Sequence, residues 1–141
     1  KSLEKLVLRK KMQNNVVEIT LDKPSKEIKF GNSSKISFHS VETVSKNKAN
    51  LISVDSHKLL FPLKLRNVKN GDYFYPIGMV GKKKVVKFLK DRKINSVDKF
   101  NKLVLVNGDD EIIWVVGMRL DRRFSVSDGS KKIIDIKIDN D

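Results

Sequence analysis

Cysteine is absent from this 141-residue sequence, which excludes disulfide bonds, thiolate zinc sites and thiol nucleophiles together. No apolar run approaches the roughly 20 residues of a membrane-spanning helix. No signal-peptide pattern follows the first residue, which is lysine, so we read the chain as a fragment of a longer protein. These absences favour a reducing, cytoplasmic location without a membrane partner. The hydrophobic fraction of 39% is nevertheless high enough to bury a core.

Residues suited to catalysis are scarce as well. The two histidines, His39 and His57, lack the spacing of a metal-binding pair, and we expect structural or solvent-exposed roles for them. The acidic run at residues 109–111 follows an Asn-Gly turn and is better explained as a charged turn than as a Mg²⁺ site. Gly78 and Gly81 stand too close together for the phosphate-binding loop of nucleotide-binding proteins. We therefore predict a non-catalytic fragment that holds no metal or cofactor of its own.

Positive charge is in large excess and is concentrated in one stretch. Thirty Lys and Arg against seventeen Asp and Glu give a net charge of +13, which favours a polyanionic partner. Residues 61–93 contain ten of the basic residues and only two acids, so they carry +8 of that charge. A surface tuned for solubility intersperses both signs. The clustering therefore indicates a contact surface more than a merely solvated lysine face.

Residues 71–94 combine a glycine-punctuated loop with a basic helix, and we interpret the rest of the chain as their scaffold. The helix is expected to begin abruptly at Lys82 and to end by Lys93. Val85, Phe88 and Leu89 recur at spacings of three and four, which makes one apolar stripe for docking on a core. Lysines occupy another face. The unpaired N–H groups and the positive dipole end of such a helix form a natural anion site.

Short strands dominate the remaining sequence, where apolar and polar residues alternate between turns rich in Gly, Asn and Asp. One run, residues 111–116, is apolar on both faces and is expected to lie between two layers. We therefore predict an α+β fold class, a β-rich two-sheet sandwich-like domain with one main basic helix packed against it. The strands are expected near residues 17–21, 27–30, 35–41, 51–54, 59–66, 103–106, 111–116, 118–124 and 134–138.

Two nucleic-acid interpretations compete for the glycine loop. Residues 78–81, Gly-Met-Val-Gly, look superficially like the GxxG loop of KH domains, which clamps a nucleotide backbone. That loop must lie between two helices, however, and Pro76 is incompatible with a helix that continues through this point. A four-residue motif also matches frequently by chance.

The second interpretation extends from Leu63 to Phe124. Its residues are Arg66, Gly71, Asp72, Phe74, Pro76, Gly78, Met79, Gly81, Lys83, Lys84, Phe88, Leu89, Lys93, Ile94, Ile113, Trp114, Val115, Gly117, Arg119 and Asp121. In order and spacing this series resembles the C-terminal domain of bacterial tRNA(Ile)-lysidine synthetase. The sequence departs from the family pattern at Tyr73, where arginine is usual, and at Asn95, where proline is frequent. Lys99 stands for a later arginine of the pattern, and lysine lacks the planar fork of arginine.

The resemblance implies a parent enzyme that uses ATP to join lysine to the wobble cytidine of an isoleucine tRNA. ATP and Mg²⁺ would belong to a missing N-terminal catalytic domain with an SGGxDS-type loop, and that domain is itself an expected partner. In this family the C-terminal domain helps to hold the tRNA, notably toward its acceptor stem. We accordingly divide the chain into an N-terminal β segment, residues 1–58, that packs on the same core, and a C-terminal tRNA-binding domain, residues 59–141.

A double-stranded stem offers phosphates and 2′-hydroxyls, so we expect it to be held by charge and shape. The alternative is a protein-interaction or scaffold module that docks on an acidic partner domain, but the dominance of lysine over arginine favours RNA. At least one of Tyr73 and Tyr75 is expected to be buried, whereas an exposed ring would suit stacking. The predicted RNA-binding residues are Lys64, Arg66, Lys82, Lys83, Lys84, Lys87, Lys90, Arg92, Lys93, Arg119 and Arg123.

Overall fold

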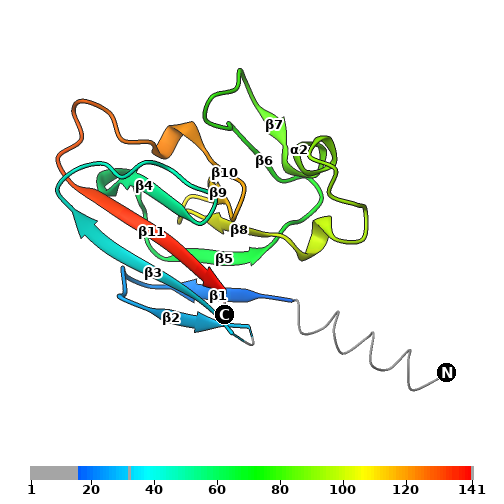
Figure 1. Ribbon diagram of the computed structural model, residues 1–141, viewed down its shortest axis with the longest axis horizontal. Helices are drawn as coiled ribbons and strands as arrows, with labels where there is room; N and C mark the ends of the chain where they lie inside the picture. The colour runs from blue at the N-terminus through cyan, green and yellow to red at the C-terminus, as the bar shows by residue number, and fades with distance from the viewer. Residues whose placement is uncertain (1–15, 32, 141) are drawn as a thin grey trace.

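Two main β-sheets form the body of the protein, and a small hairpin with one helix covers one end (Figure 1). The computed structural model describes residues 16–31 and 33–140; residues 1–15, which begin the predicted N-terminal segment, lie outside this description. The predicted α+β, two-sheet fold is confirmed. In the described part of the chain, no helix is long and apolar enough to cross a membrane.

The elements are bounded as follows. The five-stranded sheet contains β1 (Glu18–Leu21), β5 (Leu63–Asn67), β8 (Leu103–Val106), β9 (Ile112–Val115) and β10 (Arg119–Leu120) in that order. The four-stranded sheet has the order β2 (Ile28–Phe30), β3 (Ser34–Val41), β11 (Ile133–Asn140) and β4 (Leu51–Asp55). The hairpin pairs β6 (Tyr73–Phe74) with β7 (Lys83–Lys84) and precedes helix α2 (Val85–Asp91). Short 3₁₀ turns are η1 (Ser56–Lys58), η2 (Lys99–Asn101) and η3 (Arg122–Phe124).

The C-terminal strand β11 lies in the middle of the four-stranded sheet. Ile136 is opposite Phe38 of β3 on one side and Ile52 of β4 on the other, and both pairings are antiparallel. In the five-stranded sheet, β1 pairs with β5. Each sheet thus contains strands from both sides of residue 58, and the division of the chain at that point stays a prediction.

The main core fills the space between the two sheets. Leu63 and Leu65 of β5 are fully buried in it, whereas Lys64 between them is exposed, as the period of two in a strand requires. Ile136 enters from the other sheet, and Trp114 of β9 is the largest of the fully buried side chains. Each such side chain contributes roughly 1.5–3 kcal/mol of hydrophobic stabilisation.

A second core lies on the opposite face of the five-stranded sheet, beneath the hairpin and α2. Val85, Phe88 and Leu89, the predicted apolar stripe, are all buried there together with Phe74 of β6. From the sheet side Val104, Val106, Ile112 and Val115 contribute to it. Strand β9 has four buried residues divided between the two cores, which confirms that it lies between layers.

The predicted start of the helix at Lys82 is wrong. Lys83 and Lys84 form strand β7, because they pair with Phe74 and Tyr73 across the hairpin, and the helix begins at Val85. The N–H of Val85 donates to the backbone oxygen of Asp72 at 2.9 Å. The first N–H group of the helix is thus engaged within the fold and is not available to an anion.

Two predicted strands are also shorter than expected. The run at residues 59–66 is a strand only from Leu63, since the chain turns through η1 and the cis Phe61–Pro62 peptide before it. The run at residues 118–124 leaves the sheet after Leu120 and becomes η3. The buried Asp121 causes this change from strand to 3₁₀ turn, because its carboxylate accepts the backbone N–H of Arg123 at 2.8 Å and so caps η3.

Asp55 is a buried acid that makes stability depend on pH. Its carboxylate caps η1 by accepting the N–H of His57 at 2.9 Å, and it also accepts the hydroxyl of Ser130 at 2.8 Å. Burial by itself raises the pKa of Asp55, but the hydrogen bonds and the charge of Lys58 outweigh it and hold the pKa below its ordinary value. The charged form therefore contributes stability above the unfolded-state pKa of about 4, and this contribution is lost as the pH falls through the folded pKa.

We expect Asp55→Asn to flatten the acid limb of the stability curve. The free energy of unfolding, measured by urea denaturation from about pH 5 to pH 2, should fall less steeply in the variant than in the wild type. Ser130→Ala should flatten it partly, because one of the stabilising hydrogen bonds is lost. Equal slopes in all three proteins would contradict this account of Asp55.

Candidate nucleic-acid interface

The β6–β7 hairpin sorts its side chains onto two faces. Phe74 points into the second core, where its ring meets that of Phe88 edge-on with centroids 5.1 Å apart. Tyr73 and Lys84, which are paired across the hairpin, are both exposed. The expectation of a buried tyrosine is not met, since Tyr73 is 46% exposed and Tyr75 is half-buried. The outward face of the hairpin therefore carries aromatic and basic side chains side by side.

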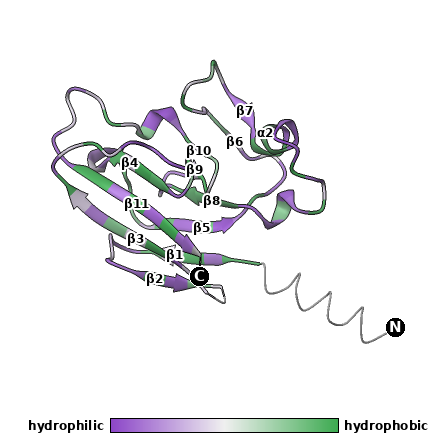
Figure 2. Ribbon diagram, viewed as in Figure 1, coloured by the Kyte–Doolittle hydropathy of each residue, from purple (hydrophilic) through white to green (hydrophobic). Residues whose placement is uncertain are grey.

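Six of the predicted lysines lie together on this hairpin and along α2. None of them forms an ion pair with any acid in residues 16–31 or 33–140. Five are exposed and Lys83 is half-buried. Figure 2 shows hydrophilic colour over β7 and much of α2. We call this group the lysine ridge; it comprises Lys82, Lys83, Lys84, Lys87, Lys90 and Lys93.

Arg66 belongs to the interior of the fold rather than to the lysine ridge. Its two terminal nitrogens bind the two oxygens of Asp72 at 2.9 Å each, and both side chains are nearly buried. The carboxylate of Asp72 also accepts the N–H of Lys69 at 2.8 Å. This bidentate pair fixes the turn before β6 onto strand β5, and it neutralises the charge of Arg66.

Arg123 is held in the same way by two acids. Its guanidinium bonds the fully buried Asp121 at 3.0 and 2.9 Å and Glu111 at 2.8 Å. Burial lowers the pKa of Arg123, but the hydrogen bond and charge of Asp121 and the charge of Glu111 raise it above its ordinary value. The charged group also packs 4.4 Å from the ring centre of Tyr75. Its positive charge is therefore compensated inside the fold.

Two further arginines hold the glycine loop in place. Arg119 donates to the backbone oxygen of Ile77 at 3.1 Å, and Arg122 donates to that of Met79 at 3.0 Å. The backbone is joined as well, since the N–H of Ile77 donates to Leu120 at 2.9 Å. These bonds attach the glycine loop to β10 and to the first residue of η3. Sequence reasoning missed the role of Arg122; the signal available was that it breaks the alternation of its segment.

The last two predicted residues lie at the margins. Arg92 is half-buried at the end of α2, with its guanidinium 4.1 Å from the ring centre of Phe88. Lys64 is exposed on β5 and lies 3.9 Å from Glu18 of β1. Of the predicted site residues, the structure thus brings the six ridge lysines together with Arg92. Arg66, Arg119 and Arg123 are engaged with the protein itself.

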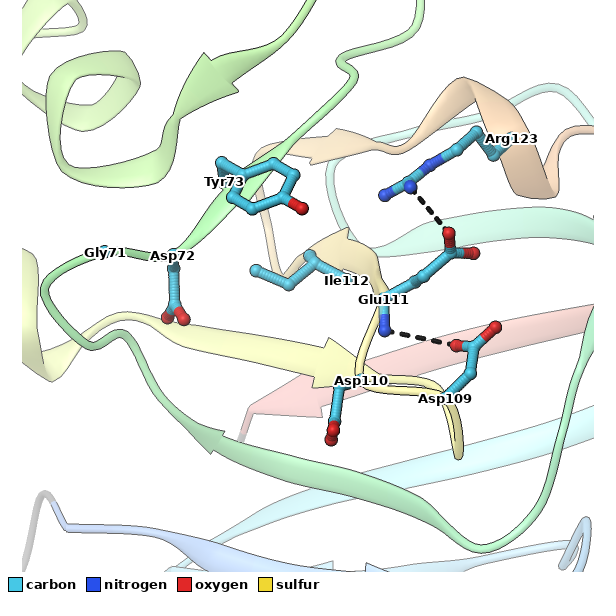
Figure 3. Close-up of a pocket in the computed structure, with 8 residues that line it drawn as sticks. All are labelled: Gly71, Asp72, Tyr73, Asp109, Asp110, Glu111, Ile112 and Arg123. Atoms are coloured by element: carbon cyan, nitrogen blue, oxygen red, sulfur yellow. Dashed lines mark hydrogen bonds and ion pairs between the residues drawn. The ribbon is translucent and has the colours of Figure 1, made fainter.

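A cavity of about 330 Å³ lies next to the hairpin (Figure 3). Tyr73 and Ile112 form its apolar part, and its polar part comes from the turn before β6, the β8–β9 turn and Arg123. The β8–β9 turn contributes Asp109, Asp110 and Glu111. Among the described residues, no group of His, Cys, Asp or Glu is arranged to hold a metal ion. The cavity is therefore acidic, in contrast to the ridge beside it.

The glycine loop connects β6 to β7, two strands of one hairpin. A KH loop lies between helices, so the KH-like alternative is wrong. Gly78 and Gly81 both adopt positive φ, 81° and 76°, in the region that favours glycine. They shape a tight loop whose tip residue, Val80, is 91% exposed.

The fold is that of a known class of protein domain. The solved chain described as "Crystal structure of TILS C-terminal domain" has a TM-score of 0.74 with this protein at 19% identity, and the likeness covers 88% of this chain and 98% of that one. Residues 63–138 match the family model described as TilS substrate C-terminal domain. Since this match spans more than half of the chain, the protein belongs to that family. The resemblance inferred from the sequence is confirmed.

Relatives with similar sequences carry the name tRNA(Ile)-lysidine synthase. That of Parabacteroides distasonis is 41% identical over 91 residues, which are 64% of this chain and 20% of the relative. That of Caldanaerobacter subterraneus subsp. tengcongensis is 30% identical over 143 residues, which are 90% of this chain and 30% of the relative. The chain thus spans between a fifth and a third of the length of these relatives.

Proposed function

We propose that this chain is the tRNA-holding domain of a tRNA(Ile)-lysidine synthase, and that the lysine ridge contacts the phosphates of the tRNA acceptor stem. The observation that carries the proposal is the ridge itself. Its six ammonium groups have no acidic partner in the described part of the chain, although the protein contains many acids. Their charge is therefore available to a polyanion.

The shape of the ridge supports a duplex as its ligand. Lys84, Lys87 and Lys90 recur every three residues, from the end of β7 along α2, so they follow one side of a rigid element. The second core fixes this element to the sheet through three buried side chains of α2. Phosphates of an A-form stem are regularly spaced, and such a stem is bound by charge and shape without reading of bases.

The chemistry of the parent enzyme lies outside this chain in the proposal. The catalytic part would use ATP and Mg²⁺ to join lysine to the wobble cytidine, and this fragment would only bind and orient the tRNA in the cytoplasm. Arg66 and Arg123 pair with acids of the fold, which leaves the ridge lysines as the cations that we propose for tRNA binding. The catalytic part of the same protein is the second partner we propose.

A titration of isoleucine tRNA at several salt concentrations tests this function. If about half of the six ridge lysines contact phosphates, the affinity should fall roughly 30-fold between 50 and 200 mM salt. A ridge that instead docks on an acidic protein domain would give weak tRNA binding without that salt dependence. Failure of tRNA to bind at 50 mM salt would refute the proposal.

A further inference from the structure

Tyr73 lies between two chemically different surfaces. The ammonium group of Lys82, a member of the lysine ridge, lies 4.4 Å from the centre of its ring. The same tyrosine lines the acidic cavity, whereas Lys82 does not. Figure 3 shows its ring above Ile112, between Asp72 and the pair formed by Glu111 and Arg123. The Tyr73 ring therefore contacts a cation of the lysine ridge and also forms part of the cavity wall.

The polar groups of the cavity accept hydrogen bonds and have few donors to offer. Each nitrogen of the Arg123 guanidinium already donates to Asp121 or Glu111. Asp109 accepts the side-chain amide of Asn107 and the N–H of Glu111, both at 3.1 Å. Asp110 has no ion pair within residues 16–31 and 33–140, and neither has Asp109. The four acidic side chains of the lining outnumber its side-chain donors, so a ligand that presents hydrogen-bond donors fits the cavity best.

These properties disfavour a phosphate in the cavity and favour an uncharged aromatic group that carries an amine. Two carboxylates without ion pairs would repel an anion. An exposed aromatic ring beside a basic ridge is the arrangement on which proteins stack unpaired bases. Carboxylates accept hydrogen bonds from the exocyclic amine of a base such as cytosine. The ridge would hold the backbone while the adjoining cavity takes a base.

We propose that this cavity binds one unstacked nucleobase carrying an exocyclic amine, which stacks on Tyr73 and donates to the carboxylates of the β8–β9 turn. The inference rests on the proposed RNA-binding function and adds to it a second, base-reading contact. Uracil has a carbonyl oxygen at the position where cytosine has the amine, so that oxygen would face the carboxylates. The cavity therefore discriminates between these two bases of equal size.

The first experiment uses neutral nucleosides, which have no phosphate to bind the ridge. Cytidine and uridine are titrated into the protein, and chemical shifts of the Tyr73 ring and of the Gly71 and Glu111 amides are recorded by NMR. We expect cytidine to shift these signals and uridine to bind at least about fivefold more weakly. Equal binding of the two nucleosides, or no shift at either, would overturn the proposal.

Two variants and one matched control locate the effect. Tyr73→Leu should abolish the cytidine shifts. Asp110→Asn should reduce the preference of the protein for cytidine over uridine, because the asparagine amide can donate a hydrogen bond to the carbonyl oxygen of uracil. Asparagine tolerates the positive φ of 70° at this position. Phe100→Leu is the control, since Phe100 is likewise exposed, carries Lys99 5.4 Å from its ring centre and lies outside this cavity. A control that loses the shifts equally would overturn the assignment.

The second experiment separates this inference from the proposed function. RNA stems that end flush, with one unpaired C, or with one unpaired U are compared in affinity. Tighter binding of the C-ended stem supports both proposals, whereas equal binding of all three stems overturns only the base site. If no stem binds but cytidine is still preferred, the proposed function fails and the base site stands. Arginine amide is titrated as a further probe. If it produced NMR shifts equal to those from cytidine, the cavity would be assigned to a basic protein side chain and the proposal would be overturned.

Discussion

Reversing the charge of Lys84, Lys87 and Lys90 together should lower the affinity for tRNA on the order of 100-fold at moderate salt. The three side chains are exposed, lie on one side of the β7–α2 unit and have no acidic partner in the described residues. Each lost phosphate contact should also reduce the slope of log affinity against log salt by about one. Fluorescence anisotropy with labelled tRNA measures both quantities.

Two controls define what this result means. Charge reversal of Lys23, Lys26 and Lys29 changes the net charge equally, but these exposed lysines lie at and before β2, away from α2 (Figure 1). Arg66→Gln breaks the bidentate pair with Asp72 and should lower stability without a comparable loss of salt dependence. If charge reversal of the three lysines near β2 weakened tRNA binding as much as charge reversal of the three ridge lysines, only net charge would matter and the lysine ridge would not be the interface.

Replacing Asp121 with alanine should lower the free energy of unfolding by about 3–5 kcal/mol. Its carboxylate is fully buried and accepts the backbone N–H of Tyr75 at 2.9 Å as well as three bonds from Arg123. The variant would leave the guanidinium of Arg123 with Glu111 as its remaining ion-pair partner and would orphan a backbone donor. That loss is a large fraction of the 5–15 kcal/mol typical of a domain.

Urea denaturation followed by circular dichroism measures this effect. Asp128→Ala is the matched control, because Asp128 is exposed in the turn before β11 and should change stability by no more than about 0.5 kcal/mol. A change below about 1 kcal/mol for Asp121→Ala would mean that the Asp121 network is replaced by water at little cost. In that case the role given to η3 in holding the loop would need revision.

The spacing of apolar residues in the sequence correctly predicts several elements of secondary structure. Ile134, Ile136 and Ile138 alternate as a strand requires, and all three are buried on one face of β11. The stripe of α2 was equally legible because three apolar residues at helical spacing have no better explanation in a basic segment. In both cases burial of the apolar side chains determines the local conformation, so the spacing of apolar residues predicts the secondary structure.

The sequence does not predict where the helix starts or what roles the arginines have. Lys83 and Lys84 are good helix formers by propensity, and only their pairing with Tyr73 and Phe74 makes them a strand. Arg66 and Arg123 look like ridge cations in the sequence, since a charge shows no partner there. Their acidic partners are known only from the structure, where both arginines form ion pairs that stabilise the fold.

The central position of β11 has a consequence for how the protein is made. While residues up to about 130 leave the ribosome, β3 and β4 have no strand between them, and apolar residues such as Ile36 and Ile52 have no complete core to enter. Pairings between segments so far apart in sequence form slowly, because a long loop must close first. The four-stranded sheet is therefore completed only after translation of β11, and until then the facing edges of β3 and β4 are unpaired and open to edge-to-edge aggregation.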